Sequence, residues 1–273
     1  MKWYFAVTQE TLAHHDHGFP GLLKTAVASA RANTTLEPNL IYHGKENSLT
    51  RDLRNMGVNI IHHQLTLAPY IRQHANAGYP VPVACGAFLR TDIPEIEQED
   101  DFILYTDCDV LFLQNPSILS ARPKYFACAP ESTLDDYVNI NTGVMVMNLP
   151  SLRQDLADFR HFILHNFERL VAYDQGAYQV YYRGRCDPLP VTGNWKPYWG
   201  VNPAAEIVHF HGPKPDALKK KLDDPLYKVP DDWARLIERD PAAYRQYLAL
   251  WESYDVYGSR LVAEALAKTQ DAV

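Results

Sequence analysis

Two carboxylates separated by one residue interrupt an apolar stretch in the middle of the chain. The stretch runs from Phe102 to Phe112, and Asp107 and Asp109 stand inside it. Unpaired charge in a buried strand is expensive, so these acids need a neutralising partner. A divalent cation with oxygen ligands is the simplest partner and can also hold a diphosphate. If the strand continues, both side chains share one face of it. The pattern predicts a metal site and suggests a nucleotide substrate.

Two other interpretations of this acid pair stay open. A surface turn at the end of a strand often carries acids, although the apolar flanks on both sides favour the metal site. An Asp-x-Asp-x-Val segment after an apolar strand is also how a haloacid-dehalogenase phosphatase begins. In such an enzyme Asp107 would be the nucleophile and Asp109 a general acid or base. Three strand-like segments precede the pair here, whereas such enzymes usually place it near the start.

Two further polar segments stand at the ends of predicted elements. Asn141-Thr142-Gly143 enters an apolar strand, where glycine lets a backbone approach a ligand closely and asparagine can bond sugar hydroxyls. A plain turn into the strand is the ordinary alternative. Asp174-Gln175-Gly176 opens a helix, where Asp174 is a good N-cap. The functional alternative puts Asp174 and Gln175 on a sugar or near a reacting carbon, and position alone does not choose.

A second cluster follows the last predicted strand. His209 and His211 alternate along it, and Gly212 and Lys214 come next. An imidazole joined to carboxylates suits a manganese-like ion, and lysine acts on phosphate as a point charge. A buried histidine before a proline-rich turn is the alternative, but the combination of residues favours a functional role.

Two other groups of residues admit a structural or a functional interpretation. One is a polar loop at residues 8–20 with no matching ligand set beside it, which we interpret as a solvated loop that can cover a site. Its histidines are His14, His15 and His17. The other is a Gly/Pro-rich loop whose aromatic side chains either stack on sugars or pin the loop to the core. They are Trp195, Tyr198 and Trp199.

Alternating strand and helix patterns must position these residues. The first sixty residues predict strands at 3–7, 39–43 and 58–62 and helices at 21–31 and 48–55. This order favours a parallel, doubly wound sheet. Further strands are expected at 125–129, 140–148 and 206–210. Further helices are expected at 84–93, ending before Pro94, and at 151–170, 174–182, 216–222 and 231–257.

Composition narrows the class of protein. The chain has 273 residues, enough for one large α/β domain or two small ones, and a net charge of −7. Since no basic stripe is present, a nucleic-acid partner is not favoured. The four scattered cysteines form no C-x-x-C pair and fit a reducing, cytoplasmic setting. No segment approaches the ~20 apolar residues of a transmembrane segment, which leaves a peripheral association with a membrane open.

In their order along the chain, these motifs resemble glycosyltransferase family 8, the family of glycogenin and of bacterial lipooligosaccharide galactosyltransferases. The resemblance covers about residues 5–215. Matching landmarks are Phe88-Leu89-Arg90 ahead of Ile93-Pro94-Glu95, then Asp107-Cys108-Asp109, Asn141-Thr142-Gly143 and Asp174-Gln175-Gly176. The family's His-x-x-Gly-x-x-Lys-Pro motif matches with one departure, since Lys214 comes one residue early. By this register His209, rather than His211, is the metal ligand.

The resemblance implies a GT-A fold: an α/β, Rossmann-like domain with a mixed, mostly parallel sheet. Residues 1–215 would form the nucleotide-sugar transferase domain, and residues 216–273 a C-terminal helical extension of it. The implied reaction moves a hexose from a nucleotide sugar, UDP-glucose or UDP-galactose, with retention of anomeric configuration. The acceptor is unknown and would be a glycan, a lipid-linked glycan or a protein.

The resemblance also assigns roles to residues. Mn²⁺ or another divalent cation would be held by Asp107, Asp109 and His209. Asp174 and Gln175 would lie near the reacting carbon as the catalytic candidates. The residues implied in donor binding are Ala6, Thr8, Glu10, Arg90, Asp107, Cys108, Asn141, Thr142, Gly143, Gly212 and Lys214.

Three hypotheses for the function follow. A metal-dependent retaining hexosyltransferase is the leading one. The second is a haloacid-dehalogenase-type phosphohydrolase with Asp107 as nucleophile, which would release phosphate from a generic ester. The third is a non-catalytic module that binds sugar nucleotides without turnover.

Overall fold

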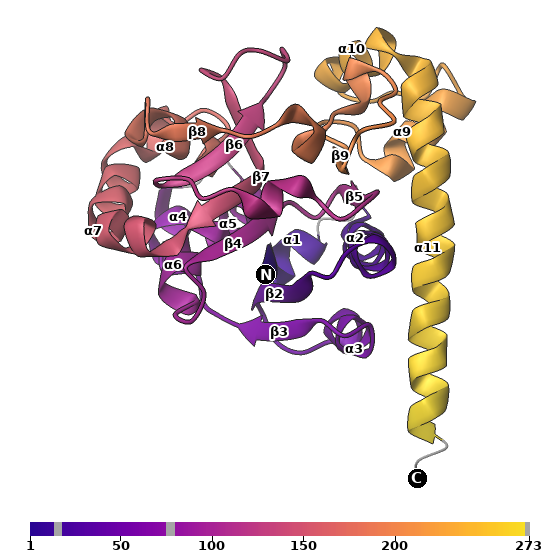
Figure 1. Ribbon diagram of the computed structural model, residues 1–273, viewed down its shortest axis with the longest axis horizontal. Coiled ribbons are helices and arrows are strands. Elements are labelled where there is room, and N and C mark those ends of the chain that lie inside the picture. Colours follow the sequence, from indigo (N-terminus) through magenta and orange to yellow (C-terminus); the bar gives the residue numbers. More distant parts are fainter. Residues whose placement is uncertain (14–17, 75–79, 271–273) are drawn as a thin grey trace.

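A seven-stranded sheet forms the centre of the computed structural model, which describes residues 1–13, 18–74 and 80–270 (Figure 1). The strand order is β3-β2-β1-β4-β7-β6-β8. The first four run parallel, β7 is antiparallel to β4 and β6, and β8 is parallel to β6. The mixed, mostly parallel sheet expected from the sequence is therefore confirmed. The strands are β1 (Lys2–Thr8), β2 (Glu37–His43), β3 (Asn59–His62), β4 (Phe102–Thr106), β6 (Phe126–Pro130), β7 (Ile140–Asn148) and β8 (Cys186–Pro188).

A second, two-stranded sheet lies beside the carboxyl end of β4. It pairs β5 (Val110–Phe112) with β9 (Ile207–His209) in antiparallel register. The strand does not continue through Asp107 and Asp109, because β4 ends at Thr106 and the chain then crosses to the second sheet. The two acids stand on the connection between the sheets.

Helices cover both faces of the main sheet (Figure 1). Alternation along β1 sends Trp3, Phe5 and Val7 into one apolar cluster and Tyr4 into another. The helices are α1 (Gln9–Ala13), α2 (Phe19–Asn33), α3 (Ser48–Asn55), α4 (Ala68–His74), α5 (Val81–Phe88), α6 (Ile93–Ile96), α7 (Leu149–Asn166), α8 (Tyr173–Tyr181), α9 (Pro215–Asp223), α10 (Asp231–Arg239) and α11 (Pro241–Gln270). Short 3₁₀ helices occur at Leu89–Asp92, Ser117–Ser120, Phe167–Arg169, Val191–Asn194 and Pro197–Trp199.

Several predicted boundaries differ from the structure for local reasons. Part of the expected loop at 8–20 is helix α1, and His14, His15 and His17 lie outside the described residues. Pro94 does not end a helix, because it occupies the first turn of α6, where no N–H bond is lost. The helix expected at 231–257 is two helices, which separate at Asp240; the Asp240 carboxylate accepts a bond from the Ala243 N–H at 2.9 Å. Helix α4 and strand β8 were not predicted.

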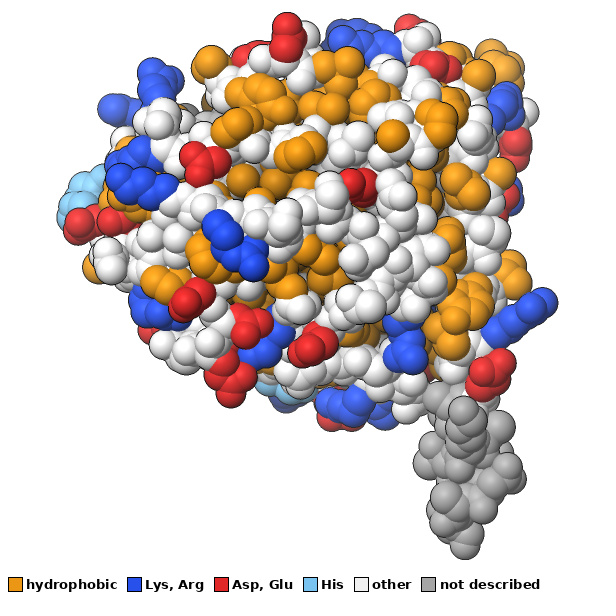
Figure 2. Space-filling model, in the orientation of Figure 1, with side chains coloured by type: hydrophobic (Ala, Val, Ile, Leu, Met, Phe, Trp, Pro, Cys, Tyr) orange, Lys and Arg blue, Asp and Glu red, His pale blue; other side chains and the backbone are white. Residues whose placement is uncertain are grey.

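The long helix α11 lies along α2 and contacts α3 and α9 (Figure 1). Its Tyr244, Tyr247 and Trp251 are buried in the same cluster as Trp3 of the sheet. On the face shown in Figure 2, basic and acidic side chains are interspersed. None of the described helices combines the length and the apolar character needed to cross a bilayer.

Candidate functional site

The connection between the two sheets brings distant segments together. The Asp107 N–H donates to the Gly143 carbonyl at 2.8 Å, which fixes the connection to β7. The Phe210 N–H donates to the Asp109 carbonyl at 2.9 Å, and Val110 faces His209 in the β5–β9 pair. Gly143 and His209 therefore lie beside the two acids.

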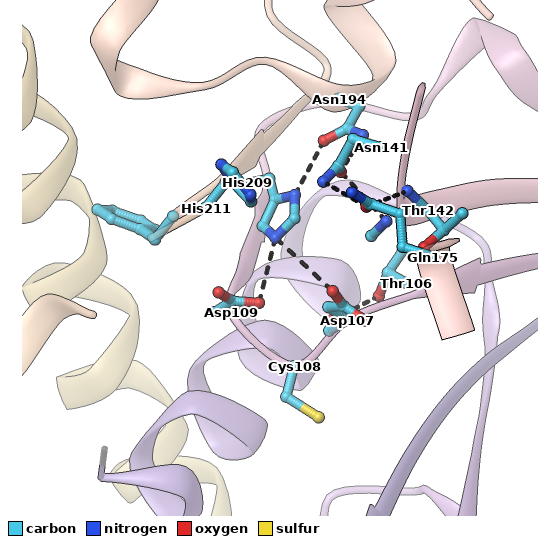
Figure 3. A network of polar contacts seen from close by, with 12 residues as sticks. Thr106, Asp107, Cys108, Asp109, Asn141, Thr142, Gln175, Asn194, His209 and His211 are labelled. Atoms are coloured by element: carbon cyan, nitrogen blue, oxygen red, sulfur yellow. Dashed lines mark hydrogen bonds and ion pairs between the residues drawn. The ribbon is translucent and has the colours of Figure 1, made fainter. Parts of the chain in front are cut away.

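Asp107, Asp109 and His209 converge on one point (Figure 3). His209 Nε2 lies 3.4 Å from Asp109 Oδ1 and 3.9 Å from Asp107 Oδ2. Asp109 and His209 are buried, while the Asp107 side chain is 32% exposed. His211 points away from the acids, and its Nε2 lies 3.6 Å from Glu131 (Figure 3). The structure thus brings together the three predicted metal ligands and leaves His211 outside them.

These three residues fit a divalent cation. Two carboxylates and one imidazole form a donor set of the kind manganese accepts. A Cβ at Gly143 would stand 2.9 Å from Asp107 Oδ2 and even closer to the His209 ring. Glycine is therefore the residue that leaves room for both ligands at this point of β7.

Lys214 returns to the acids after β9. Gly212, with φ +88°, turns the chain in a conformation that favours glycine. The Lys214 ammonium then pairs with the Asp109 carboxylate. Burial alone would raise the pKa of Asp109, but the Lys214 ammonium holds it well below its usual range. Lys214 thus places a positive charge where a phosphate could bind.

Arg90 is buried and contacts the Asp107 carboxylate. Its guanidinium donates to Asp107 Oδ1 at 2.9 Å and to the Thr142 carbonyl, and lies 4.4 Å from the centroid of the Tyr105 ring. Its Nε lies 2.6 Å from Asp174 Oδ2. Burial raises the pKa of Asp174 to about 7, with Arg90 opposing and Asp107 adding to the shift. Arg90 therefore contacts both the Asp107 and the Asp174 carboxylates.

Gln175 lies at the start of α8 and binds the entry of β7. Its Oε1 accepts from the Thr142 N–H at 3.1 Å and from Asn141 Nδ2 at 3.2 Å. Its Nε2 donates to the Glu131 carboxylate. The predicted Asn141 and Gln175 are thus in direct contact, and Glu131 is an addition that the sequence did not indicate.

A cavity of about 250 Å³ opens beside the acids. Apolar side chains from β1, α2 and α5 form most of its wall, and charged side chains form one end. The lining residues are Ala6, Thr11, Phe19, Leu22, Val83, Gly86, Ala87, Arg90, Tyr105, Asp107, Cys108, Asp109 and Lys214. Burial raises the pKa of the Cys108 thiol well above its usual range, so the thiol contributes to the wall as a neutral group.

No protein-family model matches the sequence, and no curated protein matches it. Among solved structures, glycosyltransferase GlyE of Streptococcus pneumoniae TIGR4 superposes with a TM-score of 0.63 at 17% identity, over 98% of this chain and 63% of that one. Galactosyltransferase LgtC, in complex with donor and acceptor sugar analogs, gives 0.61 at 16% identity, over 86% of this chain and 100% of that one. Mouse xyloside xylosyltransferase 1 gives 0.54 at 15%, over 77% and 98%.

The chain has the GT-A glycosyltransferase fold. The resemblance drawn from the sequence motifs is confirmed at the level of the fold, and the chain spans about 63% of the length of GlyE.

Some of the predicted donor-binding residues lie elsewhere in this GT-A fold. Thr8 and Glu10 line a neighbouring hollow, and Glu10 pairs with Arg72 at 2.8 Å. Thr8 does not line the cavity. Its hydroxyl lies 2.8 Å from the hydroxyl of Thr11, which does line it. Gly212 lies in the turn before Lys214, outside the cavity wall.

Hydrogen bonds hold the Gly/Pro-rich loop that carries Trp195, Tyr198 and Trp199 in place. Trp195 Nε1 donates to the Gly200 carbonyl at 2.8 Å, and Trp199 Nε1 to the Ser132 carbonyl at 2.9 Å. The Tyr198 hydroxyl donates to the Glu131 carbonyl at 2.5 Å. These bonds favour the structural interpretation of the three aromatic side chains.

Proposed function

We propose that this chain is a metal-dependent, retaining glycosyltransferase that moves a hexose from UDP-glucose or UDP-galactose to an acceptor hydroxyl. One observation carries the proposal: Asp107 and Asp109, which form a candidate metal site with His209, lie with Arg90 and Lys214 at the polar end of an apolar cavity. The fold that holds them is shared with solved glycosyltransferases.

The cavity offers separate surroundings for the parts of a nucleotide. The nucleoside would contact the apolar wall near Ala6 and Cys108, and would meet Thr8 and Glu10 where it extends toward the neighbouring hollow. The diphosphate would lie at the charged end, where Lys214 supplies positive charge. When bound at Asp107, Asp109 and His209, Mn²⁺ or another divalent cation would act as a Lewis acid toward the departing diphosphate.

The donor hexose would lie near the entry of β7. Asn141, Thr142 and Gly143 stand beside the acids, and Gln175 is bonded to this segment. One LgtC structure is described as an active-site mutant with glutamine replaced by glutamate, which supports a role for a glutamine in such a site. We assign Gln175 to the reacting carbon. Asp174 would act with it through Arg90, the group it contacts.

The remaining assignments concern the whole chain. We propose that residues 1–215 form the transferase domain and 216–273 its helical extension, since Trp251 packs in the same core as Trp3. The acceptor would be a glycan, a lipid-linked glycan or a protein. The four cysteines are free, which supports a reducing compartment such as the cytoplasm.

Release of UDP from UDP-glucose and UDP-galactose tests this proposal. We expect slow release with Mn²⁺ that EDTA abolishes, and faster release when a suitable acceptor is added. Metal-dependent UDP binding without turnover would favour a non-catalytic module. Phosphate release from p-nitrophenyl phosphate that is lost on Asp107→Asn would favour the phosphohydrolase.

A further inference from the structure

Asn194 is a buried side chain between the metal-binding and sugar-binding parts of the site. It is 0% exposed and lies in a 3₁₀ turn ahead of the aromatic loop. Its Oδ1 lies 3.0 Å from His209 Nδ1, and its Nδ2 donates to Asn141 Oδ1 at 2.9 Å. It is the link through which His209 contacts Asn141 (Figure 3).

Two backbone N–H groups fix the direction of every amide in this chain of contacts. A backbone N–H can only donate. The Gly143 N–H donates to Asn141 Oδ1 at 3.1 Å, so this oxygen is an acceptor and the Asn194 atom facing it must be the Nδ2 donor. The Thr142 N–H donates to Gln175 Oε1, which leaves Asn141 Nδ2 as donor to the same oxygen. Both backbone groups give the same orientation for Asn141.

The orientation of Asn194 then sets the state of the His209 ring. Since Asn194 Nδ2 faces Asn141, its Oδ1 faces His209 Nδ1 and can only accept. The proton of the neutral imidazole must therefore be on Nδ1, which leaves a bare lone pair on Nε2. Nε2 is the atom that faces Asp107 and Asp109.

We propose that Asn194 is a positioning residue that holds His209 in the Nδ1-protonated form, with Nε2 ready for a divalent cation. Through Asn141 it also couples this ligand to the segment that would hold the donor sugar. The inference rests on the proposed function in taking Asp107, Asp109 and His209 as a metal site. The partner of a ligating histidine commonly changes metal affinity by about 10–100-fold when it is removed.

The test is Mn²⁺ binding to the full chain without nucleotide, measured by the EPR signal of free Mn²⁺. The variant Asn194→Leu keeps the approximate size of the side chain and removes both bonds. The matched control is Asn39→Leu in β2. Asn39 is also buried, donates to the Glu37 carbonyl at 2.8 Å and accepts from Asn59 at 2.9 Å, but it lies away from the site.

We expect Asn194→Leu to raise the Kd for Mn²⁺ by about 10–100-fold and Asn39→Leu to leave it within about threefold. Both variants would lower the melting temperature, because each removes buried hydrogen bonds. A lowered melting temperature with unchanged Mn²⁺ affinity in Asn194→Leu would overturn the proposal, because it would show a merely structural role.

A second measurement does not depend on the folding of a variant. ¹⁵N NMR of the metal-free native chain, with the His209 signals assigned by their absence in His209→Gln, reports which ring nitrogen carries the proton. Protonation on Nδ1 is expected, and the Nε2-protonated form would overturn the proposal. Absence of UDP-hexose turnover alongside the expected Mn²⁺ and NMR results would contradict the proposed function and leave the role of Asn194 standing.

Discussion

Two clusters among the described residues are built from the same residue types, and in one of them the carboxylates line the cavity described above. In one, Asp92 contacts His63 and Arg160, on the side of the sheet near α7. In the other, Asp107 and Asp109 lie near His209 at the junction of the two sheets. Both contain acids, a histidine and an arginine or lysine, so composition does not distinguish them.

The difference lies in how the oxygens are satisfied. Asp92 is 0% exposed and accepts bonds from His63 Nε2 at 2.8 Å, the Thr66 N–H at 2.8 Å and Arg160 at 2.6 Å. Burial tends to raise the pKa of Asp92, but these bonds hold it below its usual range. The other cluster turns His209 Nε2 toward Asp107 and Asp109 at distances longer than a good hydrogen bond. A closed set of donors stabilises a fold, whereas ligand atoms that face a common point can bind an ion.

The largest effect is expected at Asp109. Asp109→Asn removes one charge from the metal ligands, and we expect kcat/KM for UDP-hexose turnover to fall about 10³-fold, with loss of metal-dependent UDP binding. The melting temperature is expected to fall as well, because the substitution also breaks the buried pair with Lys214. Steady-state kinetics and calorimetry measure both effects, and unchanged metal-dependent affinity for UDP would contradict the metal assignment.

Substitution in the Asp92 cluster should lower stability without affecting metal binding. Asp92→Asn removes the charge that pairs with Arg160, and we expect the free energy of unfolding to fall by about 3 kcal/mol, because a buried pair is broken. Urea denaturation measures this loss. The Kd for Mn²⁺ is expected to stay within about threefold of that of the native chain. A large loss of Mn²⁺ affinity would show that the Asp92 cluster also supports metal binding and would contradict the difference between the two clusters.

A pH dependence should separate Asp174 from both clusters. Its pKa of about 7 in the folded state exceeds the value of an unfolded chain, about 3.9, so the folded state binds more protons between these values. Its contribution to stability is full below about pH 4 and is lost as the pH rises through 7. We expect the stability of the native chain relative to Asp174→Asn to fall by about 2–3 kcal/mol from pH 5 to pH 8. Urea denaturation of both proteins at pH 5 and pH 8 measures this change. An equal difference in the free energy of unfolding at the two pH values would contradict the prediction.

The two histidines of β9 and its continuation offer the finest comparison. His209→Ala removes the imidazole that faces the acids and is expected to weaken Mn²⁺ binding by at least as much as removal of its partner Asn194, about 100-fold or more. His211→Ala removes a ring that points toward Glu131 and is expected to change it less than about threefold. Calorimetric titration of Mn²⁺ distinguishes them, and the reverse order would mean that the register is wrong by one strand position.

The alternating patterns predicted most of the elements. Helix α3 has the predicted bounds because the Asn47 side chain caps it. An asparagine before a helical pattern is a start signal that can be recognised in the sequence. The site motifs were also readable, since each stands at the start or the end of a predicted element, and the mixed sheet was implied by the family resemblance. The break at Asp107–Asp109 was not readable, because the apolar residues on both sides resemble one strand although they belong to two sheets.

The parts of the site that sequence reasoning missed depend on long-range contacts. Asn194 and Glu131 have no local pattern that marks them, and their partners are far away in the chain. The offset of Lys214 could be seen in the sequence, but its pairing with Asp109 needs the turn at Gly212 and the position of β9 beside β5. Local periodicity carries no information of this kind.

Calorimetric titration of UDP into the purified chain, first with Mn²⁺ and then with EDTA, would show whether nucleotide binding depends on a metal. We expect binding with Mn²⁺ in the micromolar range, about −8 kcal/mol at a Kd of about 1 μM, and its loss in EDTA. Equal binding in both conditions, or none in either, would contradict a metal-dependent nucleotide site at Asp107, Asp109 and His209.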